Sequence, residues 1–258
     1  MTAIAYSLRV YEYWWMQYRR TWRGTVFTSI VNPVFYLAAL GVGLGTLVNN
    51  AAGQPLGVPY LDFVAPGLLA AAAMQLGSME ASWPVMGSFR WTRQYYAMTA
   101  TPLGTRDVVV GHQLWMLARL AATSAIYLAV IAAFGGVNSW WGLLALPAAV
   151  LVGAAFTTPF AAYAATRDND AAFVPINRFV ILPMFLFSGT FFPVTQLPLP
   201  LELLAYLTPL WHGVDLCREL TLGDIHPWRA LGHVAYLLPF FVGGLIWAQK
   251  TYARRLFT

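Results

Sequence analysis

Charged residues are scarce in this sequence. Asp, Glu, Lys and Arg make up only 10% of its 258 residues, whereas soluble domains carry about 25%. The mean hydropathy is +0.60, and 59% of the residues are hydrophobic. This composition excludes an ordinary soluble domain and directs attention to long apolar segments.

Cysteine and lysine are nearly absent, because Cys217 and Lys250 are the only ones. A single cysteine excludes an intrachain disulfide and a thiolate metal cluster. The lysine lies in "GLIWAQKT" (244–251), which is similar to a nucleotide-binding P-loop but has glutamine at 249 in place of glycine. A phosphate cradle needs the backbone amides of a glycine-rich turn, so we expect no ATP site of this kind. "GVGLG" (41–45) lacks the third glycine of a dinucleotide fingerprint and predicts close helix packing instead.

The four histidines lack metal-ligand spacing with acids or with the cysteine, so we expect interface or structural roles for them and no metal site. In "WHGVDLCREL" (211–220), His212, Asp215 and Glu219 lie about one helical turn apart. This motif has two interpretations: a small polar site, or, as we favour, the solvated face of an outer helix. The histidines are His112, His212, His226 and His233.

Long runs without charge predict membrane-spanning helices. A helix crosses the hydrocarbon layer with about 20 apolar residues, and several runs reach that length. The sequence therefore predicts an all-α polytopic membrane protein, with residues 1–258 forming a single transmembrane domain. The charge-free runs lie between Arg23 and Asp62, between Arg119 and Arg167, between Arg178 and Glu202, and between Arg229 and Lys250. Divided at turn signals, the apolar segments predict six spans, at about 25–48, 60–86, 107–134, 140–165, 171–192 and 228–249.

Arginine is distributed unevenly over the connections between these spans. On one side, 49–59 and 135–142 hold no positive charge, and 193–229 holds only Arg218 and Arg229. The positive-inside rule therefore predicts a protein of the cytoplasmic membrane with both termini in the cytoplasm. The cations on that cytoplasmic side are Arg9, Arg19, Arg20, Arg23, Arg90, Arg93, Arg106, Arg167, Lys250, Arg254 and Arg255.

Two segments outside the spans are also apolar. Within the N-terminal segment 1–24, residues 5–23 mix Tyr, Trp and Leu with Arg, which predicts an amphipathic helix along the cytoplasmic interface. The segment lacks the apolar run and cleavage site of a signal peptide, so we expect none. On the outer side, 193–227 contains too much proline for a span. Its apolar stretches near 200–207 and 210–222 predict re-entrant helices that are buried against protein.

Glu80 and Arg119 fall within predicted spans, in the third nearest the cytoplasm. A charge at the bilayer centre costs on the order of 3 kcal/mol, and an ion pair between the two would offset much of that cost. The alternative is that Arg119 extends alone to the interface.

"SFRWTRQYYAMTATPLGTRD" (88–107) interrupts the apolar spans with arginines and aromatic residues. It predicts a short helix that turns at 102–104 into the third span. One interpretation is an ordinary cytoplasmic loop. The other is a helix that docks on a cytoplasmic partner, because Trp, Tyr and Arg concentrate binding energy at interfaces.

Four stretches carry a resemblance to a known family. "NPVFYLAALGVGLG" (32–45), "PLGTRDVVVGHQLW" (102–115), "LPMFLFSGTFFPVTQLP" (182–198) and "LTPLWHGVDLCREL" (207–220) occur in this order. On these motifs the chain resembles permease subunits of type-2 ATP-binding-cassette (ABC) exporters. It is most similar to the branch with the lipooligosaccharide (nodulation-factor) exporter and the daunorubicin-type drug exporters.

The resemblance implies a transport subunit without a catalytic site. It would pair with a second permease copy, as a homodimer or a heterodimer, and with two copies of a separate ATPase that bind ATP and Mg. The mechanism would be alternating access or a continuous conduit, and 88–104 would be the coupling helix that receives the motion of the ATPase. The coupling residues would be Arg90, Trp91, Arg93, Gln94, Tyr95, Tyr96, Thr101 and Pro102, and the outer gate Ser188, Gly189, Phe191, Phe192 and Pro193.

The aromatic content of the predicted path suits an amphipathic, lipid-linked or glycolipid cargo, because aromatic rings also stack on sugars. Each ring could instead face lipid or the protein core. The main alternative is a multidrug or lipid efflux permease of the same architecture. A more distant one is a membrane-embedded transferase, for which Asp168 and Asp170 are the only close acidic pair. The predicted cargo-path residues are Phe35, Tyr36, Phe185 and Phe187.

Overall fold

The structure, a computed structural model, describes residues 3–50 and 56–257, and every regular element in these two ranges is helical. Residues 1–2 of the predicted N-terminal segment, 51–55 of the first outer connection, and 258 lie outside them. The predicted all-α fold class is confirmed. The α-helices are α1 (Ala3–Tyr18), α2 (Trp22–Tyr36), α3 (Gly45–Asn49), α4 (Tyr60–Arg90), α5 (Gln94–Thr99), α6 (Thr105–Ala133), α7 (Ala145–Ala164), α8 (Phe173–Ile176), α9 (Leu182–Phe187), α10 (Leu199–Tyr206), α11 (Pro209–Leu222) and α12 (Pro227–Phe257). Shorter 3-10 or π segments are η1 (Leu37–Leu44), η2 (Trp140–Leu144), η3 (Asp170–Ala172), η4 (Asn177–Ile181) and η5 (Val194–Gln196).

Six helical segments in the described ranges are long and apolar enough to cross a membrane, which confirms the predicted number. The fifth ends before the predicted limit of 192, because Gly189 has φ +79, a left-handed conformation that interrupts a helix. The sixth continues beyond the predicted 249, and arginines in its last turn favour this because they complement the helix dipole. The segments are Trp22–Asn49, Tyr60–Arg90, Thr105–Ala133, Trp140–Ala164, Asp170–Phe187 and Pro227–Phe257.

The centre of the bundle is formed by α4 and α7. Gly77 of α4 lies so close to Gly153 of α7 that a Cβ at position 77 would be 2.6 Å from the Gly153 carbonyl oxygen. Small residues allow helices in a membrane to approach in this way. Gly41 has the same role in the first span, where an added Cβ would lie 2.4 Å from the Leu61 side chain. The packing interpretation of "GVGLG" is therefore confirmed at Gly41.

The spans differ in how much of their surface other parts of the chain cover. The most apolar 18-residue window is 78% buried in the second span but only 22% buried in the first and 11% in the fifth. The first and fifth spans each contain a π-helical segment, η1 and η4 respectively. These two spans therefore lie at the periphery of the single chain.

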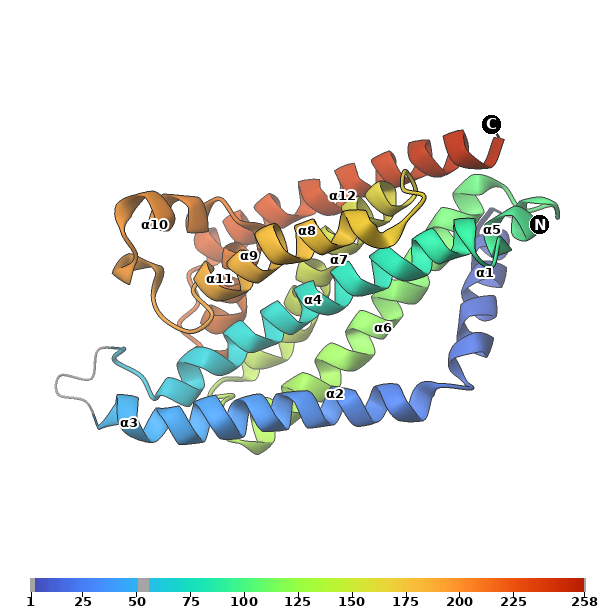
Figure 1. Cartoon of the computed structure of the whole chain (residues 1–258). Helices are drawn as coiled ribbons and strands as arrows, with labels where there is room; N and C mark the ends of the chain where they lie inside the picture. Colours follow the sequence, from blue (N-terminus) through green and yellow to red (C-terminus); the bar gives the residue numbers. More distant parts are fainter. Residues whose placement is uncertain (1–2, 51–55, 258) are drawn as a thin grey trace.

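The two ends of the bundle carry different short helices (Figure 1). The helices α1 and α5 lie at the end where both chain termini are found, and α10 lies at the opposite end, with α11 between α10 and the bundle. The helix α1 packs against α6 and ends at Tyr18, so the predicted interface helix is shorter than 5–23. The helices α10 and α11 match the two predicted outer stretches, and their entry into the bilayer stays a prediction.

Candidate functional site

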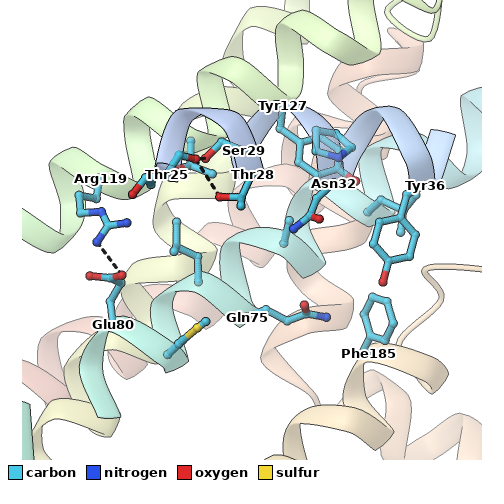
Figure 2. Close-up of a pocket in the computed structure, with 16 residues that line it drawn as sticks. Thr25, Thr28, Ser29, Asn32, Tyr36, Gln75, Glu80, Arg119, Tyr127 and Phe185 are labelled. Carbon is cyan, nitrogen blue, oxygen red and sulfur yellow. Dashed lines mark hydrogen bonds and ion pairs between the residues drawn. The ribbon is translucent and has the colours of Figure 1, made fainter. Parts of the chain in front are cut away.

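A pocket of about 310 Å³ lies between α2, α4, α6 and α9 (Figure 2). Its wall mixes apolar side chains with hydroxyls, two amides and an ion pair. This polar content is unusual for helices that cross a membrane, where polar groups mark functional sites. The polar side chains of the wall are Thr25, Thr28, Ser29, Asn32 and Tyr36 from α2, Gln75 and Glu80 from α4, and Arg119, Thr123 and Tyr127 from α6.

Glu80 and Arg119 meet at one end of the pocket. Arg119 Nη1 donates a hydrogen bond to Glu80 Oε1 at 2.7 Å, and the side chains are 18% (Arg119) and 15% (Glu80) exposed. The Arg119 guanidinium carbon also lies 5.1 Å from the centre of the Tyr18 ring. The sequence predicted both charges in the cytoplasmic third of their spans. Glu80 fits that position along α4, whereas Arg119 lies near the middle of α6.

The amides of Asn32 and Gln75 are exposed to the pocket in the single chain. Within the described ranges, neither amide makes a hydrogen bond. The hydroxyls of Thr28 and Ser29, which also line the pocket, instead donate to carbonyls of their own helix and can still accept a hydrogen bond. An unpaired amide in hydrocarbon costs several kcal/mol. These groups therefore need a polar partner from outside the chain.

Only part of the predicted cargo path belongs to this pocket. Tyr36 and Phe185 line it, and Figure 2 shows their rings near one another at the end away from Arg119. Phe35 and Phe187 lie outside it, 70% and 39% exposed respectively. Phe35 points away from the pocket that Tyr36 lines, because neighbouring positions on a helix point about 100° apart. The place of Phe35 and Phe187 in the cargo path stays a prediction.

The predicted coupling segment forms an exposed surface at the end of the bundle that carries α1. The helix α5 begins at Gln94 rather than at 88, since α4 continues to Arg90. Arg93 precedes α5 with φ 52, the only left-handed non-glycine residue in the described ranges. Such a conformation costs roughly 1 kcal/mol or more for a residue with a side chain. The exposed residues of this surface are Arg90, Trp91, Arg93, Tyr96, Thr101 and Pro102.

Tyr95 does not belong to that exposed surface, because it is completely buried. Its ring lies 4.8 Å from Phe89 and 5.3 Å from Tyr252, and its hydroxyl bonds His112. Gln94 is half-buried and accepts a hydrogen bond from the Tyr13 hydroxyl of α1 at 2.8 Å. A partner therefore cannot contact Tyr95 directly; this ring anchors α5 to α4, α6 and α12.

The helix α1 is joined firmly to the same end. The Trp14 ring stacks on His112 with centroids 3.9 Å apart. Gly111 of α6 lets the α1 backbone approach, since a Cβ there would be 2.4 Å from the Ser7 carbonyl oxygen. Together with the hydrogen bond between Tyr13 and Gln94, these contacts hold α1, α5 and the adjoining end of α6 against one another.

The predicted outer gate is a buried turn. Ser188 donates to or accepts from Thr208 at 2.9 Å, and Arg218 Nη2 donates to the Gly189 carbonyl at 2.7 Å. Arg218 also donates to Phe63 at 3.2 Å, so one guanidinium joins this turn to α4. Burial lowers the pKa of Arg218 to about 10, which still leaves it charged at neutral pH. In the same turn, Phe191, Phe192 and Pro193 are half-buried.

The motif that contains His212, Asp215 and Glu219 is not a solvated helix face. All three residues are half-buried, because α11 packs against the start of α12. This brings His233 from α12 onto them, a contact between residues far apart in the chain. The interpretation that we favoured from the sequence was wrong here.

Asp168 and Asp170 have structural roles. Asp168 accepts a hydrogen bond from Arg255 Nη2 at 2.7 Å, and Asp170 begins η3.

Sequence reasoning missed the amides of the pocket, although a signal was present: Asn32 is a polar residue within a charge-free run.

Comparison with known proteins places these features in a family. The family described as "ABC-2 type transporter" matches residues 10–222. Nodulation protein J of Rhizobium leguminosarum bv. viciae is 34% identical over 215 residues, which cover 81% of each chain. Nodulation protein J of Rhizobium meliloti (strain 1021) is 30% identical over 237 residues, or 88% of each chain. The inner membrane transport permease YadH of Escherichia coli (strain K12) is 25% identical over 199 residues, or 76% of each chain.

Proposed function

The chain belongs to the ABC-2 type transporter family and is a permease component of a transporter, and we propose that it exports an amphipathic, lipid-linked or glycolipid cargo across the cytoplasmic membrane. The observation that carries this proposal is the polar pocket in the spans, with the amides of Asn32 and Gln75 beside aromatic rings. Amides and hydroxyls suit the hydroxyls of a sugar headgroup. The uncovered sides of the first and fifth spans suit a lipid tail.

Energy for this export would come from two copies of a separate ATPase, which bind ATP and Mg. The glycine that a P-loop requires is replaced by glutamine at 249, and Gly244 lies inside α12, packed against Pro159. The exposed surface around Trp91 and Tyr96 offers aromatic and cationic side chains to such a partner. The buried Tyr95 would pass the motion on to α4, α6 and α12.

A second permease copy would complete the pocket. The first and fifth spans flank it, and little of either is covered by the rest of the single chain: their most apolar windows are only 22% and 11% buried. Pairing along these spans would cover their apolar sides and bring two sets of pocket amides toward each other. Both termini would lie in the cytoplasm, as the arginine distribution supports.

The alternative of a multidrug or lipid efflux permease predicts a different selectivity. An apolar drug gains little from amides, whereas a sugar loses a hydrogen bond when one amide is removed, worth about 0.5–1.5 kcal/mol. The membrane-embedded transferase is set aside, because the family is one of transport permeases.

The test uses the permease and the ATPase that co-purifies with it, reconstituted in liposomes. A lipooligosaccharide is expected to stimulate ATP hydrolysis, and Gln75→Leu to weaken its half-maximal concentration by about 2–10-fold. Stimulation by an apolar drug should be unchanged in the same variant. Met79→Leu, on the same wall of the pocket, is the matched control. Stimulation by drugs alone, with no response to the glycolipid, would overturn the proposal in favour of the efflux alternative.

A further inference from the structure

Three side chains of metal-ligating types lie close together where α11 meets α12, at the end of the bundle opposite the two termini. Asp215 and Glu219 lie four residues apart on α11, and His233 comes from α12. One ligand atom from each residue lies within 4.8 Å of the other two. His233 Nε2 is 3.2 Å from Asp215 Oδ2, but the two groups are not aligned for a hydrogen bond.

Two buried atoms in this cluster lack a hydrogen-bond partner among the described residues: Glu219 Oε2 and His233 Nε2. The His233 side chain is only 7% exposed, so water does not readily supply the missing partner. A buried polar atom without a partner costs about 1–3 kcal/mol. A cation between the three side chains would remove that cost for both atoms at once.

The other nitrogen of the His233 ring is already engaged. Nδ1 lies 2.9 Å from Nδ1 of His212, and the His212 ring stacks on Tyr236 with centroids 3.8 Å apart. When His233 carries its proton on Nδ1, it donates to His212 and keeps the Nε2 lone pair for a metal. A histidine ligand is normally fixed in this way by a second hydrogen bond.

The neighbouring arginine does not neutralise the two carboxylates by direct contact. Arg218 follows on α11, but its guanidinium donates to the carbonyls of Phe63 and Gly189. A divalent ion would neutralise the two negative charges of the carboxylates, and the neutral imidazole would add a ligand without adding charge.

We propose that Asp215, Glu219 and His233 form a binding site for a divalent transition-metal ion, with Zn²⁺ as the best match. One imidazole and two carboxylates are ligands that Zn²⁺ accepts, with water at a fourth position. The ion joins α11 to α12 and so fixes the outer helix on the sixth span. This site is independent of the proposed cargo.

The test uses the full-length permease, purified with a tag that lacks histidine and held in lipid nanodiscs after removal of metal by a chelator. Zn²⁺ titrated by calorimetry is expected to bind at one ion per chain. Asp215→Asn, Glu219→Gln and His233→Gln should each weaken binding by about 10-fold or more. Asp224→Asn is the matched control, because Asp224 is exposed in the connection between the same two helices. It should bind as the wild type does.

Spectroscopy with Co²⁺ covers the case in which a site variant does not fold. Visible absorption bands of low-symmetry Co²⁺ should appear in the wild type and be displaced by Zn²⁺. His212→Gln should fold and weaken binding less than His233→Gln does, because His212 only orients the ligand. Binding that is the same in Glu219→Gln, or that disappears in the Asp224→Asn control, would overturn the proposal. Absence of both a calorimetric and a spectroscopic signal in the wild type would also overturn it.

Discussion

The ion pair between Glu80 and Arg119 makes a quantitative prediction about stability. Removing one partner from a buried pair leaves an uncompensated charge and typically costs about 3–5 kcal/mol. Both side chains are more than four-fifths buried, so we expect Glu80→Ala to fall in this range. Arg119→Ala should cost less than Glu80→Ala does if Glu80 takes up a proton. The double variant removes both charges and should be destabilised by clearly less than the sum of the single variants.

The assay can use the chain's own thiol. Cys217 is the only cysteine and is completely buried, so a fluorogenic maleimide reports unfolding without any added label. Unfolding is followed in mixed micelles with increasing dodecyl sulfate for the wild type, both single variants and the double variant. The coupling energy is the difference between the double variant and the sum of the singles.

The pair of Arg9 and Glu12 provides the matched control. It has a 3.1 Å contact one turn apart on α1, but its side chains are 66% and 56% exposed. An exposed pair of this kind contributes about 0.3–0.5 kcal/mol, so its cycle should be nearly additive. An additive cycle for Glu80 and Arg119 as well would refute the reasoning, because it would mean that the two charges do not stabilise each other.

Three further predictions concern Arg93, Gly77 and the proposed zinc site. Arg93→Gly should leave the free energy of unfolding unchanged or raise it by about 1 kcal/mol, because glycine adopts φ 52 without strain. ATP hydrolysis by the assembled transporter should nevertheless fall. Unchanged hydrolysis would mean that Arg93 is not part of the coupling surface. Gly77→Ala should destabilise by about 1–3 kcal/mol, because its Cβ would lie 2.6 Å from the Gly153 carbonyl. Gly243→Ala, which meets nothing within 4 Å, should be nearly neutral in the same thiol assay, and equal effects of the two changes would contradict this packing argument. Zn²⁺ at 100 times its dissociation constant should raise the free energy of unfolding by about 2.7 kcal/mol, an increase that a chelator abolishes and that Glu219→Gln lacks.

The spans were predictable because a membrane imposes a simple rule on sequence. Charge-free runs of sufficient length have few structural alternatives, and the six predicted segments are found with small differences at their ends. The short helices were harder. In a six-residue helix such as α5, one turn of periodicity does not separate buried from exposed aromatics, so Tyr95 and Tyr96 looked equivalent although only Tyr95 is buried.

The cluster of Asp215, Glu219 and His233 could not be predicted from spacing in the sequence. Asp215 and Glu219 are separated from His233 by the turn that precedes α12, and their contact depends on the angle at which α11 folds back against that helix. Spacing within one segment says nothing about this angle. The pocket was missed for a related reason: Asn32, Gln75 and Arg119 come from three helices, and only their packing brings them to one cavity.

The amides of Asn32 and Gln75, which make no hydrogen bond in the described ranges, also affect how stable a newly synthesised chain is before it assembles. Before any partner arrives, acyl chains that entered the pocket would offer these groups neither a donor nor an acceptor. The proposed pairing with a second permease copy would bring polar partners to these amides. We therefore expect unpaired copies to be short-lived in cells, and substitution of both amides by leucine to prolong their survival even as it abolishes transport.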